Sequence, residues 1–172
     1  MNRARPPVAL DRALSDRLVG RVVVVGIGNP FRGDDGAGCA VARGLRGMPD
    51  LTIVESEDVP ERDILRIADA RPDTVVLVDA VDLGARPGSV ALLEPERLAG
   101  YAPSTHRVPL SLLAEILHRA CGADVVVLAI QPEHTAHGAR LSRAVAESVA
   151  VMVDVIRRSA VGGAGGREVA AC

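Results

Sequence analysis

Lysine is absent from this sequence of 172 residues, so all 20 basic side chains are arginine. A chain without lysine cannot form a Schiff base, anchor pyridoxal phosphate or supply the lysine of a phosphate-binding loop. Aromatic residues are almost as scarce, because Phe31 and Tyr101 are the only two and tryptophan is missing. The core must therefore be aliphatic, and the stacking platforms of proteins that bind single-stranded nucleic acid are missing. The net charge of −2 also gives no basic surface for DNA or RNA.

Cysteine is sparse and unevenly placed, with Cys39, Cys121 and Cys172 far apart and no CxxC pair. This pattern argues against a structural zinc site and against a disulfide framework. No apolar run reaches the roughly 18 residues of a membrane helix. The N-terminal stretch lacks the apolar segment of a signal peptide. We therefore expect a cytoplasmic protein that binds neither membrane nor nucleic acid.

Short apolar runs alternate with helical patterns along residues 21–158, which we interpret as one domain. The expected strands are residues 21–27, 51–55, 74–79, 89–93 and 124–130, and the expected helices are residues 35–45, 60–70, 108–120 and 141–156. This alternation predicts an α/β fold, a three-layer sandwich around a mainly parallel sheet of five strands, with 89–93 at its edge. We expect residues 1–20 to form a loosely ordered extension and the Gly/Ala-rich residues 159–172 to form a disordered tail.

Acidic residues gather where the expected strands end. In open α/β sheets the working site lies beyond the carboxyl ends of the strands. The residues placed there are Asp34-Asp35, Glu55, Asp79 and Gln131-Pro132-Glu133. An acid that closes an apolar strand, as Asp79 closes VVLVDA, is costly to desolvate unless it is paired or binds a cation. A helix cap or a hydrogen bond to a neighbouring loop is the structural alternative.

The stretch GIGNPFRGDDG at residues 26–36 matches a phosphate-binding loop only in part. Phe31 stands where the third glycine of G-x-G-x-x-G should be. Gly28 and Gly33 keep the glycine spacing of a P-loop, but Asp34-Asp35 replace its Lys-Ser pair. Two carboxylates without a lysine disfavour a phosphate, so we expect the glycines to turn the backbone after the strand and expect no nucleotide binding.

Histidines and possible nucleophiles complete the chemical inventory. His106 lies in PSTHRVPL before a helix, and His134 and His137 lie in the loop QPEHTAHG. No G-x-S-x-G elbow occurs, and Cys39 and Cys121 fit structural positions within and at the end of helices. What remains is a crevice rich in carboxylates with a histidine, a set that suits a divalent transition metal. Such a metal polarises a carbonyl or activates water.

Four motifs occur in order: GIGNPFRGDDGAG after the first strand, VVLVDAVDLGARPG at the third, STHRVPL before a helix and LAIQPE at the fifth. Together they resemble the [NiFe]-hydrogenase maturation endopeptidases, above all the branch that processes the large subunit of formate-hydrogenlyase-type hydrogenases. The resemblance runs from Val22 to Ile156. It implies a twisted five-stranded sheet of phosphorylase/hydrolase-like type, a monomer, and an endopeptidase. The implied substrate is a large-subunit precursor that already carries nickel and loses a short C-terminal extension.

The same resemblance implies roles for single residues. Asp35, Asp79 and His106 would bind the nickel, which the precursor supplies and the enzyme does not hold permanently. For Asp34 two roles stay open, because it either caps the helix or shares the site.

One segment departs from the family's pattern. The family commonly has Asp-Gly-Gly after its second strand, where the segment is thought to help substrate recognition, and this chain has Glu55-Ser56-Glu57. Glu55, Glu57 and Asp34 are therefore candidates for substrate recognition. The altered segment also motivates an alternative function, a non-catalytic chaperone that binds nickel or the precursor on the same fold.

Overall fold

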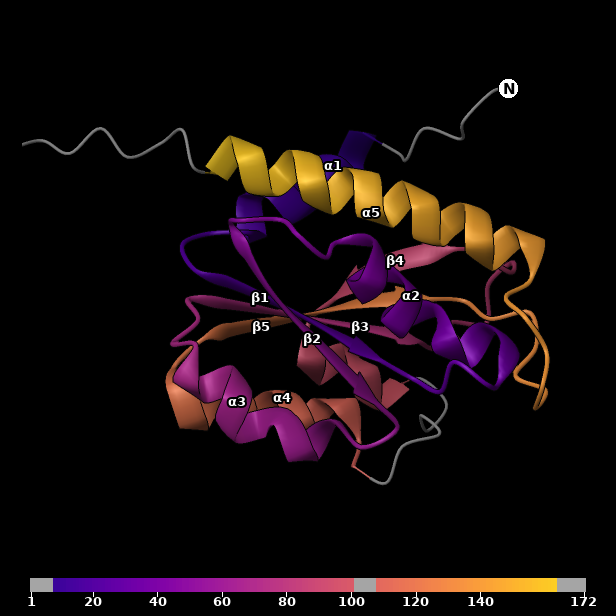
Figure 1. Cartoon of the computed structure of the whole chain (residues 1–172), viewed down its shortest axis with the longest axis horizontal. Coiled ribbons are helices and arrows are strands. Elements are labelled where there is room, and N and C mark those ends of the chain that lie inside the picture. The colour runs from indigo at the N-terminus through magenta and orange to yellow at the C-terminus, as the bar shows by residue number, and fades with distance from the viewer. Residues whose placement is uncertain (1–7, 101–107, 164–172) are drawn as a thin grey trace, which may run out of the picture.

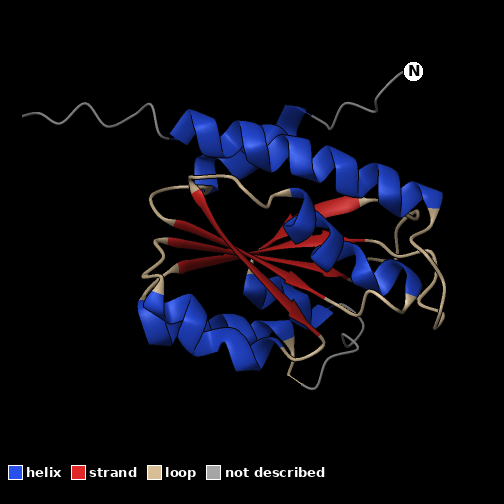
Figure 2. Cartoon of the chain, in the orientation of Figure 1, coloured by secondary structure: helices blue, strands red, loops and turns tan. Residues whose placement is uncertain are grey.

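The structure, a computed structural model of the chain, describes residues 8–100 and 108–163. One sheet is built from β1 (Val22–Ile27), β2 (Leu51–Glu57), β3 (Thr74–Ala80), β4 (Val90–Leu93) and β5 (Asp124–Ile130). The α-helices are α1 (Val8–Arg17), α2 (Ala37–Gly44), α3 (Ile64–Asp69), α4 (Leu110–Cys121) and α5 (Arg143–Gly163). Helices α1, α2 and α5 cover one face of the sheet, and α3 and α4 cover the other (Figures 1 and 2). The predicted three-layer α/β sandwich is confirmed.

The strands are buried on both faces because successive side chains point to opposite sides of the sheet. On β1, Val22 and Val24 belong to the core beneath α1, α2 and α5, whereas Val23 and Val25 belong to the core beneath α3 and α4. Both cores are aliphatic, and no aromatic side chain is buried in the described part of the chain. The continuous apolar run of valines follows from this double burial.

The order of the strands indicates where a ligand is expected to bind. The sheet runs β2-β1-β3-β5-β4, with β4 antiparallel at the edge, as the sequence predicted for residues 89–93. The other neighbouring strands are parallel. From β1 the chain moves outward to β2 and then returns to the far side of β1 to form β3. The topological switch point therefore lies between β1 and β3, and the carboxyl ends of these strands are the expected place for a ligand.

The expectation of a loosely ordered amino-terminal extension is wrong for residues 8–17, which form α1. Leu14 and Leu18 are buried, Leu10 packs against the same core, and this spacing of four residues was the signal for a helix. The guanidinium of Arg17 contacts Glu94 and binds Asp124, with Nε 2.9 Å from Oδ2. Helix α5 likewise continues to Gly163, within the segment expected to be a tail.

Within residues 8–100 and 108–163, no helix is both long and apolar enough to cross a bilayer.

Glu57 ends β2 in a left-handed conformation. Gly26 pairs with Glu55 and Ile27 with Glu57, so the strand pair carries a bulge at Ser56. Glu57 has a φ of 45° and its backbone carbonyl accepts a hydrogen bond from the N–H of Gly28 at 2.9 Å. The departure from the family's Asp-Gly-Gly therefore puts a side chain where the backbone favours glycine.

We expect Glu57→Gly to raise the free energy of unfolding by ~0.5–1 kcal/mol, because glycine adopts this conformation without strain. Denaturant titration measures the difference. The control is Arg62→Gly, an exposed position in a helical turn, which should lower stability by about 1 kcal/mol. A loss of stability in Glu57→Gly would contradict the assignment of strain to this residue.

Candidate active site

The turn after β1 is built on Gly28. Its φ of 117° is a conformation that side chains rarely adopt. A Cβ on Gly28 would lie 1.7 Å from the backbone oxygen of Asp35 and 3.7 Å from Oδ1 of Asp79. The missing side chain therefore allows two carboxylate-bearing residues, from different elements, to meet the same turn.

Asp35 and Asp79 are both buried at this turn. Asp35 lies on a 3₁₀ turn (Gly33–Gly36) that leads into α2, and its Oδ2 accepts a hydrogen bond from the N–H of Asn29 at 2.9 Å. Asp79 lies near the end of β3, and its Oδ1 accepts a hydrogen bond from the N–H of Ala80 at 2.8 Å. Only 3% of Asp35 and 0% of Asp79 is exposed. Backbone donors thus orient both carboxylates at the β1/β3 switch point.

Asp35 and Asp79 thus bring two buried carboxylates to one turn of the backbone. Oxygen donors of this kind, together with an imidazole, suit a divalent transition metal. Within the described residues, no three His, Cys, Asp or Glu side chains are grouped as a metal site. His106, the predicted third ligand, lies outside the described residues, so its role stays a prediction.

Asp34 is directed into the protein. Its Oδ1 accepts a hydrogen bond from the N–H of Ser142 at 2.6 Å, and its Oδ2 accepts hydrogen bonds from Glu133 and His134 at 2.8 and 3.2 Å. Burial by itself raises the pKa of Asp34, but these backbone hydrogen bonds outweigh it and lower the pKa below its ordinary value. Asp34 therefore ties the 3₁₀ turn to the loop between β5 and α5.

The two adjacent aspartates, Asp34 and Asp35, have different surroundings. Asp34 is fully buried and both of its oxygens accept hydrogen bonds from backbone N–H groups, which gives it a structural role. Its suggested role in substrate recognition stays a prediction. Of the pair, Asp35 is the residue that meets the Gly28 turn beside Asp79.

We expect Asp34→Asn to lower the free energy of unfolding by ~1–3 kcal/mol. The NH₂ group of the asparagine would face a backbone N–H, and two donors cannot form a hydrogen bond. The pKa of Asp34 is lower in the folded protein than its ordinary value of 3.8 in the unfolded chain. Ionised Asp34 therefore stabilises the fold above pH 3.8, and this stabilisation is lost as the pH falls toward the pKa of the folded protein. The difference between wild type and variant should therefore be full at pH 7 and shrink below about pH 4. Thermal unfolding across this range measures it, and a difference that stays constant would contradict the assigned hydrogen bonds.

The two glutamates of the segment Glu55-Ser56-Glu57 have different surroundings. The carboxylate of Glu55 binds Arg43 of α2, with Oε2 2.8 Å from Nε, and also contacts Arg46. Glu57 is exposed at the end of β2. Both remain predictions for substrate recognition, and Glu57 is the one whose side chain faces solvent.

Asn29 is the residue that sequence reasoning missed. Its backbone N–H binds Asp35, its Nδ2 donates to Oδ2 of Asp58 at 2.9 Å, and its Oδ1 accepts from the N–H of Phe31 at 2.9 Å. The side chain of Asn29 thus connects the loops after β1 and β2, and its backbone N–H fixes a site carboxylate. The signal was an asparagine before Pro30 in a glycine-rich turn, where asparagine binds nearby backbone groups.

The two cysteines in the described part of the chain have structural roles, as the sequence predicted. Cys39 is fully buried in α2, and its thiol donates to the backbone oxygen of Gly28 at 3.2 Å. Burial raises the pKa of Cys39 to about 11, which keeps the thiol protonated and unreactive. The thiol of Cys121, at the end of α4, donates to the backbone oxygen of Leu117 at 3.0 Å.

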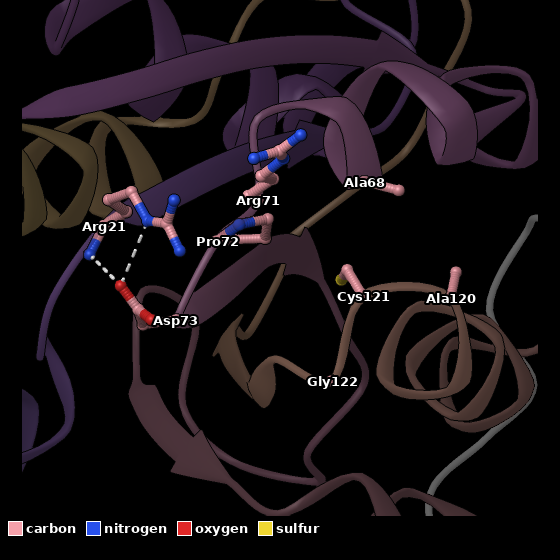
Figure 3. Close-up of a pocket in the computed structure, with 8 residues that line it drawn as sticks. All are labelled: Arg21, Ala68, Arg71, Pro72, Asp73, Ala120, Cys121 and Gly122. Carbon is pink, nitrogen blue, oxygen red and sulfur yellow. Dashed lines mark hydrogen bonds and ion pairs between the residues drawn. The ribbon is translucent and has the colours of Figure 1, made fainter.

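A hollow of about 420 Å³ lies away from these carboxylates (Figure 3). Its lining is Arg21, Ala68, Arg71, Pro72, Asp73, Ala120, Cys121 and Gly122. These residues precede β1 and β3 or belong to the ends of α3 and α4, so the hollow lies at the amino ends of the strands. Its carboxylate, Asp73, accepts a hydrogen bond from the N–H of Arg21 at 2.7 Å. The hollow therefore lies at the opposite end of the strands from the Gly28 turn.

Comparisons with known proteins agree on one family. The sequence model described as hydrogenase maturation protease (HycI) matches residues 42–159. The hydrogenase 3 maturation protease of Escherichia coli K12 is 34% identical over 114 residues, which cover 64% of this chain and 72% of that protein.

Solved structures show the same likeness. The [NiFe] hydrogenase maturation protease HycI from Thermococcus kodakarensis KOD1 has a TM-score of 0.79 and 33% identity, covering 87% of this chain and 99% of that one. The endopeptidase HycI from Escherichia coli has a TM-score of 0.74 and 28% identity, covering 81% and 90%.

Proposed function

Because the chain belongs to the hydrogenase maturation protease family, we propose that it is an endopeptidase acting on a [NiFe]-hydrogenase large-subunit precursor. It removes the C-terminal extension of a precursor that already carries nickel. The convergence of the buried Asp35 and Asp79 on the Gly28 turn is the observation that supports this proposal most strongly. The cation that two such carboxylates favour arrives with the substrate.

Asp35 and Asp79 act by binding the precursor's nickel and so fixing the precursor at the carboxyl ends of β1 and β3. With His106 as the third ligand, this docking places the scissile peptide bond beside the metal. Water then adds to the carbonyl carbon, the C–N bond breaks, and the released amine takes up a proton. Nickel polarises the carbonyl or positions the water, and both alternatives use the same ligands.

The cysteine chemistry supports hydrolysis without a covalent intermediate on the enzyme. The thiol that lies nearest the turn, that of Cys39, is buried in α2 and has a raised pKa of about 11. A protonated thiol is a poor nucleophile. The carboxylates that remain at the turn suit metal binding.

Incubation of the purified protein with nickel-loaded precursor tests the activity. Mass spectrometry of the precursor should show the loss of one C-terminal peptide and no further change. A stable complex without loss of mass would instead support the non-catalytic chaperone. The isolated protein should contain no stoichiometric nickel after dialysis, because the metal belongs to the substrate.

A further inference from the structure

We propose that Phe31 is a substrate-contact residue, whose ring packs against an apolar side chain of the precursor close to the bond that is cut. The proposal rests on the proposed function, because it names a contact for the same substrate at the same site. It adds a recognition element that the carboxylates do not supply.

The exposure of the ring is the first observation. Phe31 is 70% exposed and is the only aromatic residue among those that the structure describes. Exposed apolar residues are common on proteins, and Val19, Leu65 and Leu112 are others here. Phe31 differs from these residues in how its backbone is held and in where it lies.

The backbone around Phe31 is fixed on both sides. Its N–H donates to Oδ1 of Asn29 at 2.9 Å, and its carbonyl accepts a hydrogen bond from the N–H of Gly138 at 2.7 Å. The next residue donates its N–H to the carbonyl of Asn29 at 3.0 Å, and Gly33 donates to the carbonyl of Ala139 at 3.2 Å. A ring on a backbone held in this way meets a partner without the entropy loss of ordering a loop.

The position of Phe31 connects it with the site. Asn29, which binds the N–H of Phe31, also donates its own N–H to Oδ2 of Asp35. Two successive tight turns of the backbone lie between Phe31 and this carboxylate. In the first, the N–H of Arg32 donates to the carbonyl of Asn29, and in the second, the N–H of Asp35 donates to the carbonyl of Arg32. An extended peptide advances about 3.3 Å per residue. A precursor bound at Asp35 therefore brings side chains near the scissile bond to the ring.

The chemistry of the surroundings favours one side chain of a peptide as the partner. Membranes and second copies of a chain bind to apolar surfaces of several hundred Å². Phe31 is a single ring beside the exposed Arg32, and the loop whose Gly138 binds its carbonyl exposes the polar Glu133, His134 and His137, which gives no such surface. An apolar side chain on a polar peptide matches this arrangement.

Steady-state processing of the nickel-loaded precursor tests the contact. We expect Phe31→Ala to raise KM by ~10- to 100-fold and Phe31→Leu to raise it less, because the contact contributes apolar area to binding. The value of kcat should change by less than about twofold, because the contact is the same in ground and transition states. Leu65→Ala, at a residue of α3 that is 78% exposed, is the control and should leave both constants unchanged.

Equilibrium binding of the same precursor separates the two proposals. If the wild-type protein cleaves and Phe31→Ala keeps its KM and Kd, the contact is overturned and the activity stands. If the wild-type protein does not cleave but Phe31→Ala weakens Kd, the activity is overturned and the contact stands. A fall in kcat alone would give Phe31 a loop-positioning role and also overturn the contact. Thermal unfolding confirms that each variant is folded.

Discussion

Replacing Asp79 with asparagine is expected to reduce kcat/KM for the nickel-loaded precursor by roughly 100- to 1000-fold. Asparagine keeps the size of the side chain and an oxygen that can accept the hydrogen bond from Ala80, which measures 2.8 Å. It removes the negative charge that a nickel ion requires from its ligand. Asp35→Asn should have an effect of the same order, for the same reason. Time courses of the precursor's mass give the rates.

Stability distinguishes loss of function from loss of fold. Asp79→Asn keeps the size of the side chain and the acceptor for the N–H of Ala80, so its unfolding temperature should stay close to the wild-type value. The control is Asp69→Asn, an exposed position at the end of α3, which should leave kcat/KM unchanged. Full activity in a folded Asp79→Asn protein would remove this residue from the site.

Gly28→Ala should lower the free energy of unfolding by at least ~3 kcal/mol, the second large effect that we expect. Its Cβ would lie 1.7 Å from the backbone oxygen of Asp35, and backbone atoms can relieve this overlap only by moving the turn. The movement would also disturb the hydrogen bond between Asn29 and Asp35. Denaturant titration measures the loss of stability, and residual folded protein should cleave poorly.

Gly47→Ala is the matched control for this substitution. Gly47 also has a positive φ, 83°, but no atom lies within 4 Å of a Cβ placed there. Its replacement should cost only the conformational strain, about 1–2 kcal/mol. Equal losses in the two variants would show that the close approach of Asp35 does not constrain Gly28.

Much of the fold follows from local patterns. The valine run of β1 and the apolar run of β3 predict strands that are buried on both faces, and the alternation with helices predicts the layers. The short strand β4 lies at the sheet edge, as its flanking prolines indicated. That Asp35 and Asp79 meet also follows from a general rule, because the carboxyl ends of parallel strands share one edge of the sheet.

The remaining features depend on contacts between distant parts of the chain. The partners of Asp34 lie about a hundred residues further along the sequence, so no local pattern distinguishes it from Asp35. The hydrogen bond of Asn29 to Asp58 joins the loops after two different strands, which no local pattern indicates. Helix α1 is weakly amphipathic and gains its order by packing Leu14 against α5, which a reading of polar composition overlooks.

The dependence of cleavage on nickel is the central claim, and one comparison measures it. Nickel-loaded and nickel-free forms of the same precursor are incubated with the wild-type protein, and the mass of each is followed by mass spectrometry. We predict that only the nickel-loaded form loses its C-terminal peptide, as the proposed binding of the substrate's metal by Asp35 and Asp79 requires. Equal cleavage of both forms would contradict it.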